Sequence, residues 1–100
     1  MRVETITVES SAVPTVEIDT AVRAAYIRFS NEKVAKTISD NRPGVVVAID
    51  LNAKGKVIGI ELIGVSDFSI ETLLKLARAK APRSDLSQTR YVKAGEPVPV

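Results

Sequence analysis

Few residues of this chain could do chemistry, because the sequence contains neither cysteine nor histidine. Their absence excludes disulfides, thiolate or imidazole zinc sites, thiol nucleophiles and Ser–His relays. A metal would need oxygen ligands, and acid–base chemistry would fall to Asp, Glu, Lys or Tyr. We therefore expect a non-enzymatic protein with no catalytic residues and no cofactor.

One polar cluster could form across neighbouring strands. Tyr26 and Arg28 alternate with apolar residues, and so does Glu61, so all three point away from an apolar face. If their strands are neighbours, Arg28 could pair with the carboxylate of Glu61. Such a cluster could bind a polar ligand. The favoured interpretation is a structural cross-strand pair, which contributes about 0.2–1 kcal/mol.

A second pattern nearly matches a calcium-binding loop. Asp50, Asn52 and Glu61 occupy the first, third and twelfth positions of such a loop, with Gly55 at the sixth. The fifth position is Lys54, a cation where an oxygen ligand is needed, and the flanking residues favour strands over helices. An ordinary hairpin is the favoured interpretation, so we expect no metal site.

A third pattern is a basic helix face formed by Lys75, Arg78 and Lys80. Cations on one face could contact phosphates. No aromatic stacking residue lies beside them, and Glu71 interrupts the charge. A solvated helix face is therefore the favoured interpretation.

The elements that must position these residues are short strands followed by one helix. Alternating or β-branched apolar residues predict about five strands, at Val16–Asp19, Ala25–Phe29, Val34–Ile38, Val45–Ile49 and Lys56–Ile63. The expected fold is α+β, with a small antiparallel sheet in meander order and a C-terminal amphipathic helix.

The helix is predicted from about Ser69 to Lys80. Its apolar side chains recur at helical spacing, and Ser69 is of a type that caps helix N-termini. Pro82 stops the helix, because the residue before a proline is disfavoured in the α conformation.

A single domain is expected over residues 13–81. Residues 1–12 form an N-terminal extension, with a possible strand at Thr5–Val8, and residues 82–100 form a polar, proline-containing tail with a possible edge strand at Thr89–Lys93. The N-terminus lacks the apolar core of a signal peptide, and no apolar run could span a bilayer. A cytoplasmic location is therefore expected.

The order of these segments resembles the bacterial and archaeal family catalogued as domain of unknown function 2283, over Val16 to Ser66. One departure is Lys54, where the family usually has an aspartate before the glycine. The resemblance implies a compact β-rich fold with a C-terminal helix and no established activity. It rests on segments in a fixed order: Ile18-Asp19, Ala25–Ser30, Val34–Thr37, Pro43-Gly44-Val45, Gly55 and Val57–Leu62.

Association is the expected role. The strand Val45–Ile49 is apolar on both faces, so both faces need cover, whereas one helix can cover only one. The chain's own terminal strands or a second subunit would cover the other, and a homodimer is favoured because one self-complementary patch serves both copies. The alternative is an antitoxin-like or nucleic-acid-associated regulatory protein that acts through the basic helix and the tail. With a net charge of +2, nucleic-acid binding is the less favoured of the two.

Overall fold

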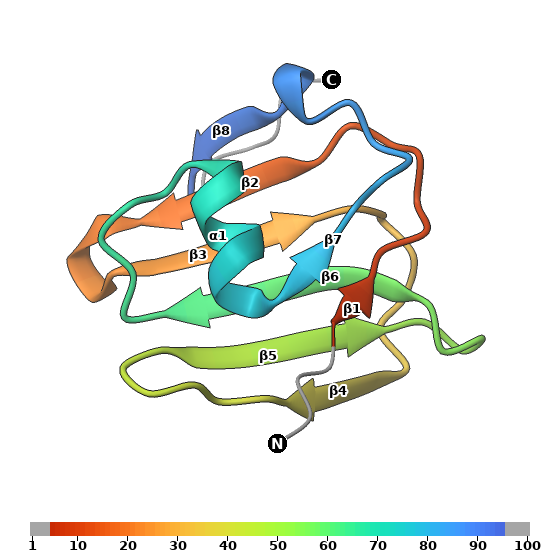
Figure 1. The fold of residues 1–100 in the computed structure, drawn as a ribbon, viewed down its shortest axis with the longest axis horizontal. Coiled ribbons are helices and arrows are strands. Elements are labelled where there is room, and N and C mark those ends of the chain that lie inside the picture. Colours follow the sequence, from red (N-terminus) through yellow and green to blue (C-terminus); the bar gives the residue numbers. More distant parts are fainter. Residues whose placement is uncertain (1–4, 96–100) are drawn as a thin grey trace.

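The computed structural model describes residues 5–95 and shows a twisted sheet crossed by one helix (Figure 1). The order across the six-stranded sheet is β4-β5-β6-β3-β2-β8. Together with the helix, this confirms the α+β class. The strands of the sheet are β2 (Thr15–Asp19), β3 (Ala24–Arg28), β4 (Lys36–Ser39), β5 (Val46–Leu51), β6 (Val57–Ile63) and β8 (Arg90–Lys93).

The sheet is mixed, and it is neither purely antiparallel nor a meander as expected, because β3 pairs with β6 and not with β4. Strands β2 to β6 pair antiparallel, whereas β8 pairs parallel to β2, with Val16 opposite Tyr91. Parallel neighbours need a long crossover, which the chain between the two strands supplies. The tail therefore returns to the sheet and forms one of its edges.

The helix α1 (Ile70–Ala77) begins and ends close to the predicted positions, but it is not C-terminal. Its N-terminus is capped by Ser69, whose hydroxyl accepts from the Thr72 N–H at 3.4 Å. The phenol oxygen of Tyr91 in β8 accepts from the Ile70 N–H at 2.8 Å. The chain after α1 is therefore part of the fold, because β8 pairs with β2 and is bonded to the start of the helix.

A second, two-stranded sheet joins the N-terminal segment to the end of the helix. Strand β1 (Ile6–Thr7) pairs parallel with β7 (Ala79–Lys80). The Ile6 N–H donates to the Arg78 carbonyl at 2.9 Å, and Val8, directly after β1, is fully buried. Two short 3₁₀ helices complete the fold, η1 (Thr20–Val22) and η2 (Leu86–Gln88).

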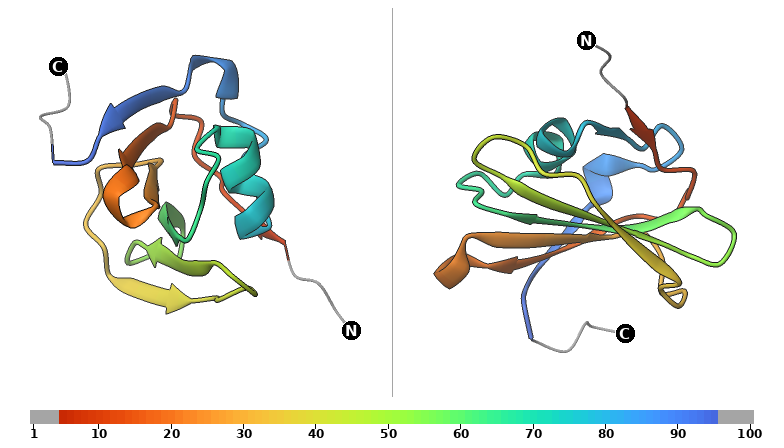
Figure 2. Two further views of the ribbon diagram at one scale, coloured as in Figure 1. Left: turned by 90° about the vertical axis from the view of Figure 1, so that its left-hand side faces the viewer. Right: turned by 90° about the horizontal axis from the view of Figure 1, so that it is seen from below.

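The core lies between one face of the sheet and the layer formed by α1, β1 and β7. Figure 2 shows these three elements together on one side of the sheet. Each fully buried apolar side chain contributes about 1.5–3 kcal/mol. The largest of them are Phe29, Ile27, Ile60, Leu62, Ile70 and Leu73. We call the other side of the sheet the open face; it carries Glu17, Tyr26, Arg28, Asp50 and Glu61.

Within residues 5–95, the chain itself covers only one face of the strand expected at Val45–Ile49. Val47 and Ile49 are buried beneath the helix layer, whereas Val46 on the open face is 48% exposed. Strands β1 and β8 do not cover this face, because β1 lies with the helix and β8 extends the sheet.

The loop between β6 and α1 is held by Arg23, which has a left-handed backbone (φ 53°) at the end of η1. Its carbonyl accepts from the N–H groups of Gly64 and Val65, and its guanidinium donates back to the carbonyls of the same two residues. Within residues 5–95, no helix is long and apolar enough to cross a membrane.

Candidate functional site

The open face is built from two rows of residues that lie opposite one another across the strands. In one row, Glu17 on β2 faces Tyr26, which in turn faces Glu61 on β6. In the next row, Arg28 faces Gly59, and Gly59 faces Asp50 on β5. Antiparallel partners share a face and have Cβ atoms about 4.5–5.5 Å apart. The structure therefore brings the three predicted residues Tyr26, Arg28 and Glu61 onto one face.

The ion pair in this cluster is not the expected one. Arg28 bonds to Glu17, whose Oε2 lies 2.8 Å from Nε and 2.7 Å from Nη2 of the guanidinium. The guanidinium carbon also lies 5.1 Å from the centre of the Tyr26 ring, within cation–π range. Glu61 faces Tyr26 on the next strand but is exposed. The sequence held a signal for Glu17, because it alternates with Val16 and Ile18 as Glu61 does with Ile60.

Tyr26 leans diagonally across Gly59 to reach β5. Its hydroxyl donates to Asp50 Oδ2 at 2.8 Å, and Thr37 Oγ1 on β4 donates to the other oxygen, Oδ1, at 2.6 Å. The ring fills the space that a side chain at position 59 would occupy, because a Cβ there would lie 1.7 Å from the tyrosine oxygen. A hydrogen-bonded chain thus joins β3, β5 and β4 across the glycine.

The protonation of Tyr26 suits this role. Partial burial, followed by the hydrogen bond to Asp50, raises the pKa of the phenol above its ordinary value of 10.0. The hydroxyl therefore remains protonated at neutral pH and acts as a donor. Both oxygens of Asp50 already accept hydrogen bonds, and Arg28 is bonded to Glu17. This arrangement suits a network that fixes strand register, with no charged group left free at its centre.

The residues of the near-match to a calcium loop have other partners. Asn52 Oδ1 accepts from the N–H groups of Lys54 and Lys56 and so closes the β5–β6 hairpin. Gly55 supplies the positive φ of 78° that the turn requires. Asp50 is held by Tyr26 and Thr37 as described. Among residues 5–95, no group of three acidic side chains is placed to hold a metal ion.

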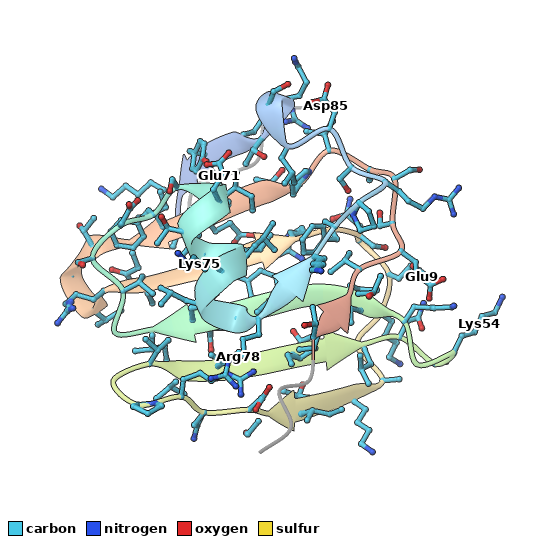
Figure 3. The ribbon with its side chains drawn as sticks, in the orientation of Figure 1. Glu9, Lys54, Glu71, Lys75, Arg78 and Asp85 are labelled. Atoms are coloured by element: carbon cyan, nitrogen blue, oxygen red, sulfur yellow. The ribbon has the colours of Figure 1, made fainter. Side chains whose placement is uncertain are left out.

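The basic residues of the helix region are spread over three positions. Figure 3 shows Lys75 on the outer side of α1 and Arg78 at its C-terminal end, with Glu71 at the opposite end. Lys80 follows in β7, and all three cations are exposed. Arg78 ends the helix in a left-handed conformation (φ 54°), and its N–H donates to the carbonyls of Leu74 and Lys75. Its backbone therefore serves as a helix cap.

A groove of about 860 Å³ was not predicted from the sequence. It lies between the segment before β2, the loop after β3 and the β5–β6 hairpin, so three distant parts of the chain form it. Lys56 bonds to Glu9 across it, and Arg28 bonds to Glu17. Both signs of charge line the groove and largely neutralise each other. No local motif could have revealed it.

Comparison with known proteins identifies the family of the chain. No curated protein matches it, and no solved structure matches it either. Residues 15–66 match a family described as protein of unknown function. This segment runs from the first residue of β2 to just beyond β6 and includes the Tyr26–Gly59 contact. As the match covers slightly more than half of the residues, the chain belongs to the family of proteins of unknown function DUF2283.

Proposed function

We propose that this protein is a non-enzymatic module that associates with a second copy of itself at the β4 end of its sheet. The observation that carries the proposal is the exposed apolar side chain of Ile38 on the edge strand of the sheet. Ile38 on β4 is 40% exposed on the helix side of the sheet, whereas Val46 on β5 lies opposite Ile63 on β6 on the open face, both also exposed. Val34, just before β4, is exposed as well.

A second copy at the β4 edge is the simplest cover for Ile38. One self-complementary surface closes a two-fold dimer, so no second kind of surface is needed. The centre of the open face does not need cover, because Tyr26 and Thr37 bond to Asp50 and Arg28 bonds to Glu17. The absence of an evident reactive group in that network favours a non-enzymatic role.

Sedimentation equilibrium at micromolar concentration tests the proposal. We expect a species of twice the chain mass that dissociates on dilution, and Ile38→Ser should shift it toward monomer. Val22→Ser is the matched control, because Val22 is exposed on η1, outside the β4 end of the sheet. A monomer at every concentration would overturn the proposal.

A further inference from the structure

Strand β4 forms an edge of the sheet, and β5 is its one strand neighbour within residues 5–95. Figure 1 shows it at the lower edge, with β5 as its neighbour. All four of its residues are exposed. The ladder with β5 continues to Asp40, whose N–H donates to the Val47 carbonyl at 2.8 Å. An edge of this kind is a template for another strand.

The backbone groups that are free to pair can be identified from the register. Ile38 lies opposite Ile49, two residues before the bonded pair of Asp40 and Val47. In an antiparallel ladder, alternate residues exchange hydrogen bonds with the neighbour, and those between them point outward. Thr37 and Ser39 therefore turn their N–H and C=O groups away from β5.

We propose that the second copy binds at this edge, with the two β4 strands paired antiparallel about a two-fold axis through Ile38. This inference rests on the proposed function and states where and how the two copies meet. The axis places Thr37 opposite the partner's Ser39 and Ser39 opposite the partner's Thr37. Four hydrogen bonds between the copies result, and the two sheets become one continuous sheet.

The side chains agree with this register at every position. Ile38 meets the partner's Ile38 on the helix side of the sheet, so its exposed apolar surface is buried. Lys36 meets the partner's Asp40 on the same side, and the axis repeats this ion pair. On the open face, the hydroxyl of Ser39 meets that of the partner's Thr37.

Neighbouring registers lack this agreement. An axis through Thr37 would place Lys36 against the partner's Ile38, and Val34 against the partner's Asp40. An axis through Ser39 would bring Ile38 against the partner's Asp40 and Lys36 against the partner's Arg42. Of these three axes, only the one through Ile38 places Ile38 against the partner's Ile38 and Lys36 against the partner's Asp40.

Lys36 has a second consequence for specificity. A lysine on an edge strand discourages pairing with unrelated strands, because an added strand would bury the ammonium group. In the proposed register, the partner's Asp40 supplies the compensating charge. Asp40 already bonds to Arg42 through Oδ2, at 2.8 Å, which leaves Oδ1 for the partner. The edge thus admits its own copy and disfavours other strands.

A charge swap tests the register, measured by sedimentation equilibrium on the full chain. Lys36→Asp and Asp40→Lys should each weaken dimerisation by about tenfold, because each change places like charges together twice across the axis. The double variant should recover to near the wild-type affinity. Asp40→Lys and the double variant both lose the bond to Arg42, so the difference between their dimer affinities reports only the pairing of positions 36 and 40. Lys75→Asp, on the helix, is the control and should have no effect.

A proline tests the backbone bonds independently. The Ser39 N–H points outward, so Ser39→Pro should leave the subunit folded by circular dichroism and abolish the dimer. A wild-type chain that is always monomeric would overturn both the proposed function and this inference. A wild-type dimer that tolerates Ser39→Pro and both single charge reversals would overturn this inference alone.

Discussion

Replacing Gly59 with alanine should break the contact that Tyr26 makes between β3 and β5. The new Cβ would lie 1.7 Å from the tyrosine oxygen and 2.3 Å from Cζ, so the ring must leave its position. The displaced ring loses its hydrogen bond to the charged Asp50, about 1.5–3 kcal/mol. It also loses the contact with Arg28, about 0.5–1 kcal/mol.

The backbone partly offsets this loss. Alanine is favoured over glycine within a strand by roughly 0.5–1 kcal/mol, and Gly59 does not have a positive φ. We therefore expect Gly59→Ala to lower the free energy of unfolding by about 1–3.5 kcal/mol. Urea unfolding followed by far-UV circular dichroism measures this change, since the chain has no tryptophan to report by fluorescence.

A double-mutant cycle separates the contact from the backbone effect. In the Tyr26→Ala background, the obstacle is absent, so Gly59→Ala should stabilise by about 0.5–1 kcal/mol. The coupling between the two positions should then be about 2–4 kcal/mol. Tyr91→Ala is the control background, in which Gly59→Ala should cost as much as in the wild type. Equal costs in the Tyr26→Ala and wild-type backgrounds would refute the reasoning.

Four further measurements follow from the structure. Arg78→Gly should raise the free energy of unfolding by up to about 1 kcal/mol, because glycine adopts the left-handed conformation of this helix cap without strain. Arg23→Gly should be the less stable of the two variants, because it also removes two side-chain hydrogen bonds to the β6–α1 loop. The pKa of Tyr26 is raised in the folded state, so its contribution to stability is complete below pH 10.0 and is lost as the pH rises through the folded value. Above pH 10.0, the urea midpoint should therefore fall more steeply with pH in the wild type than in Tyr26→Phe. Parallel plots of midpoint against pH for the two proteins would contradict this. Calorimetric titration should show no calcium uptake near millimolar concentration, and saturable binding abolished by Asp50→Ala would reveal a site. Binding to nucleic acid through the face that includes Lys75 should be weak and should collapse between about 50 and 200 mM salt, whereas submicromolar binding to a defined sequence at physiological salt would favour a regulatory role.

Strands β2 to β6 could be predicted from the sequence because their signals are local. Alternation at Tyr26, Ile27 and Arg28 identifies both the strand and the face on which each side chain lies. The same parity correctly placed Glu61 on the open face. It did not reveal which carboxylate Arg28 bonds, because Glu17 and Glu61 have equal parity and the choice depends on side-chain direction.

The remaining features depend on contacts between distant residues. The pairing of β8 beside β2 was not predicted, because the short segment Arg90–Lys93 carries no signal for its neighbour or direction. The apolar content of the open face was overestimated for a related reason. Counting apolar residues by parity treats Gly59 as an uncovered position, whereas the ring of Tyr26 lies over it. Such diagonal contacts become visible only when the register is known.

The division between the family segment and the rest of the chain has a consequence for synthesis. Residues 15–66 hold the five antiparallel strands, whereas α1 and β7, which cover their apolar face, come later in the chain. On the ribosome, Ile27, Ile60 and Leu62 therefore emerge before the helix that buries them. The apolar face of the nascent sheet therefore stays exposed, or bound to a chaperone, until the residues up to 80 have left the exit tunnel. Burial of the apolar face of the sheet thus follows the synthesis of α1 and β7.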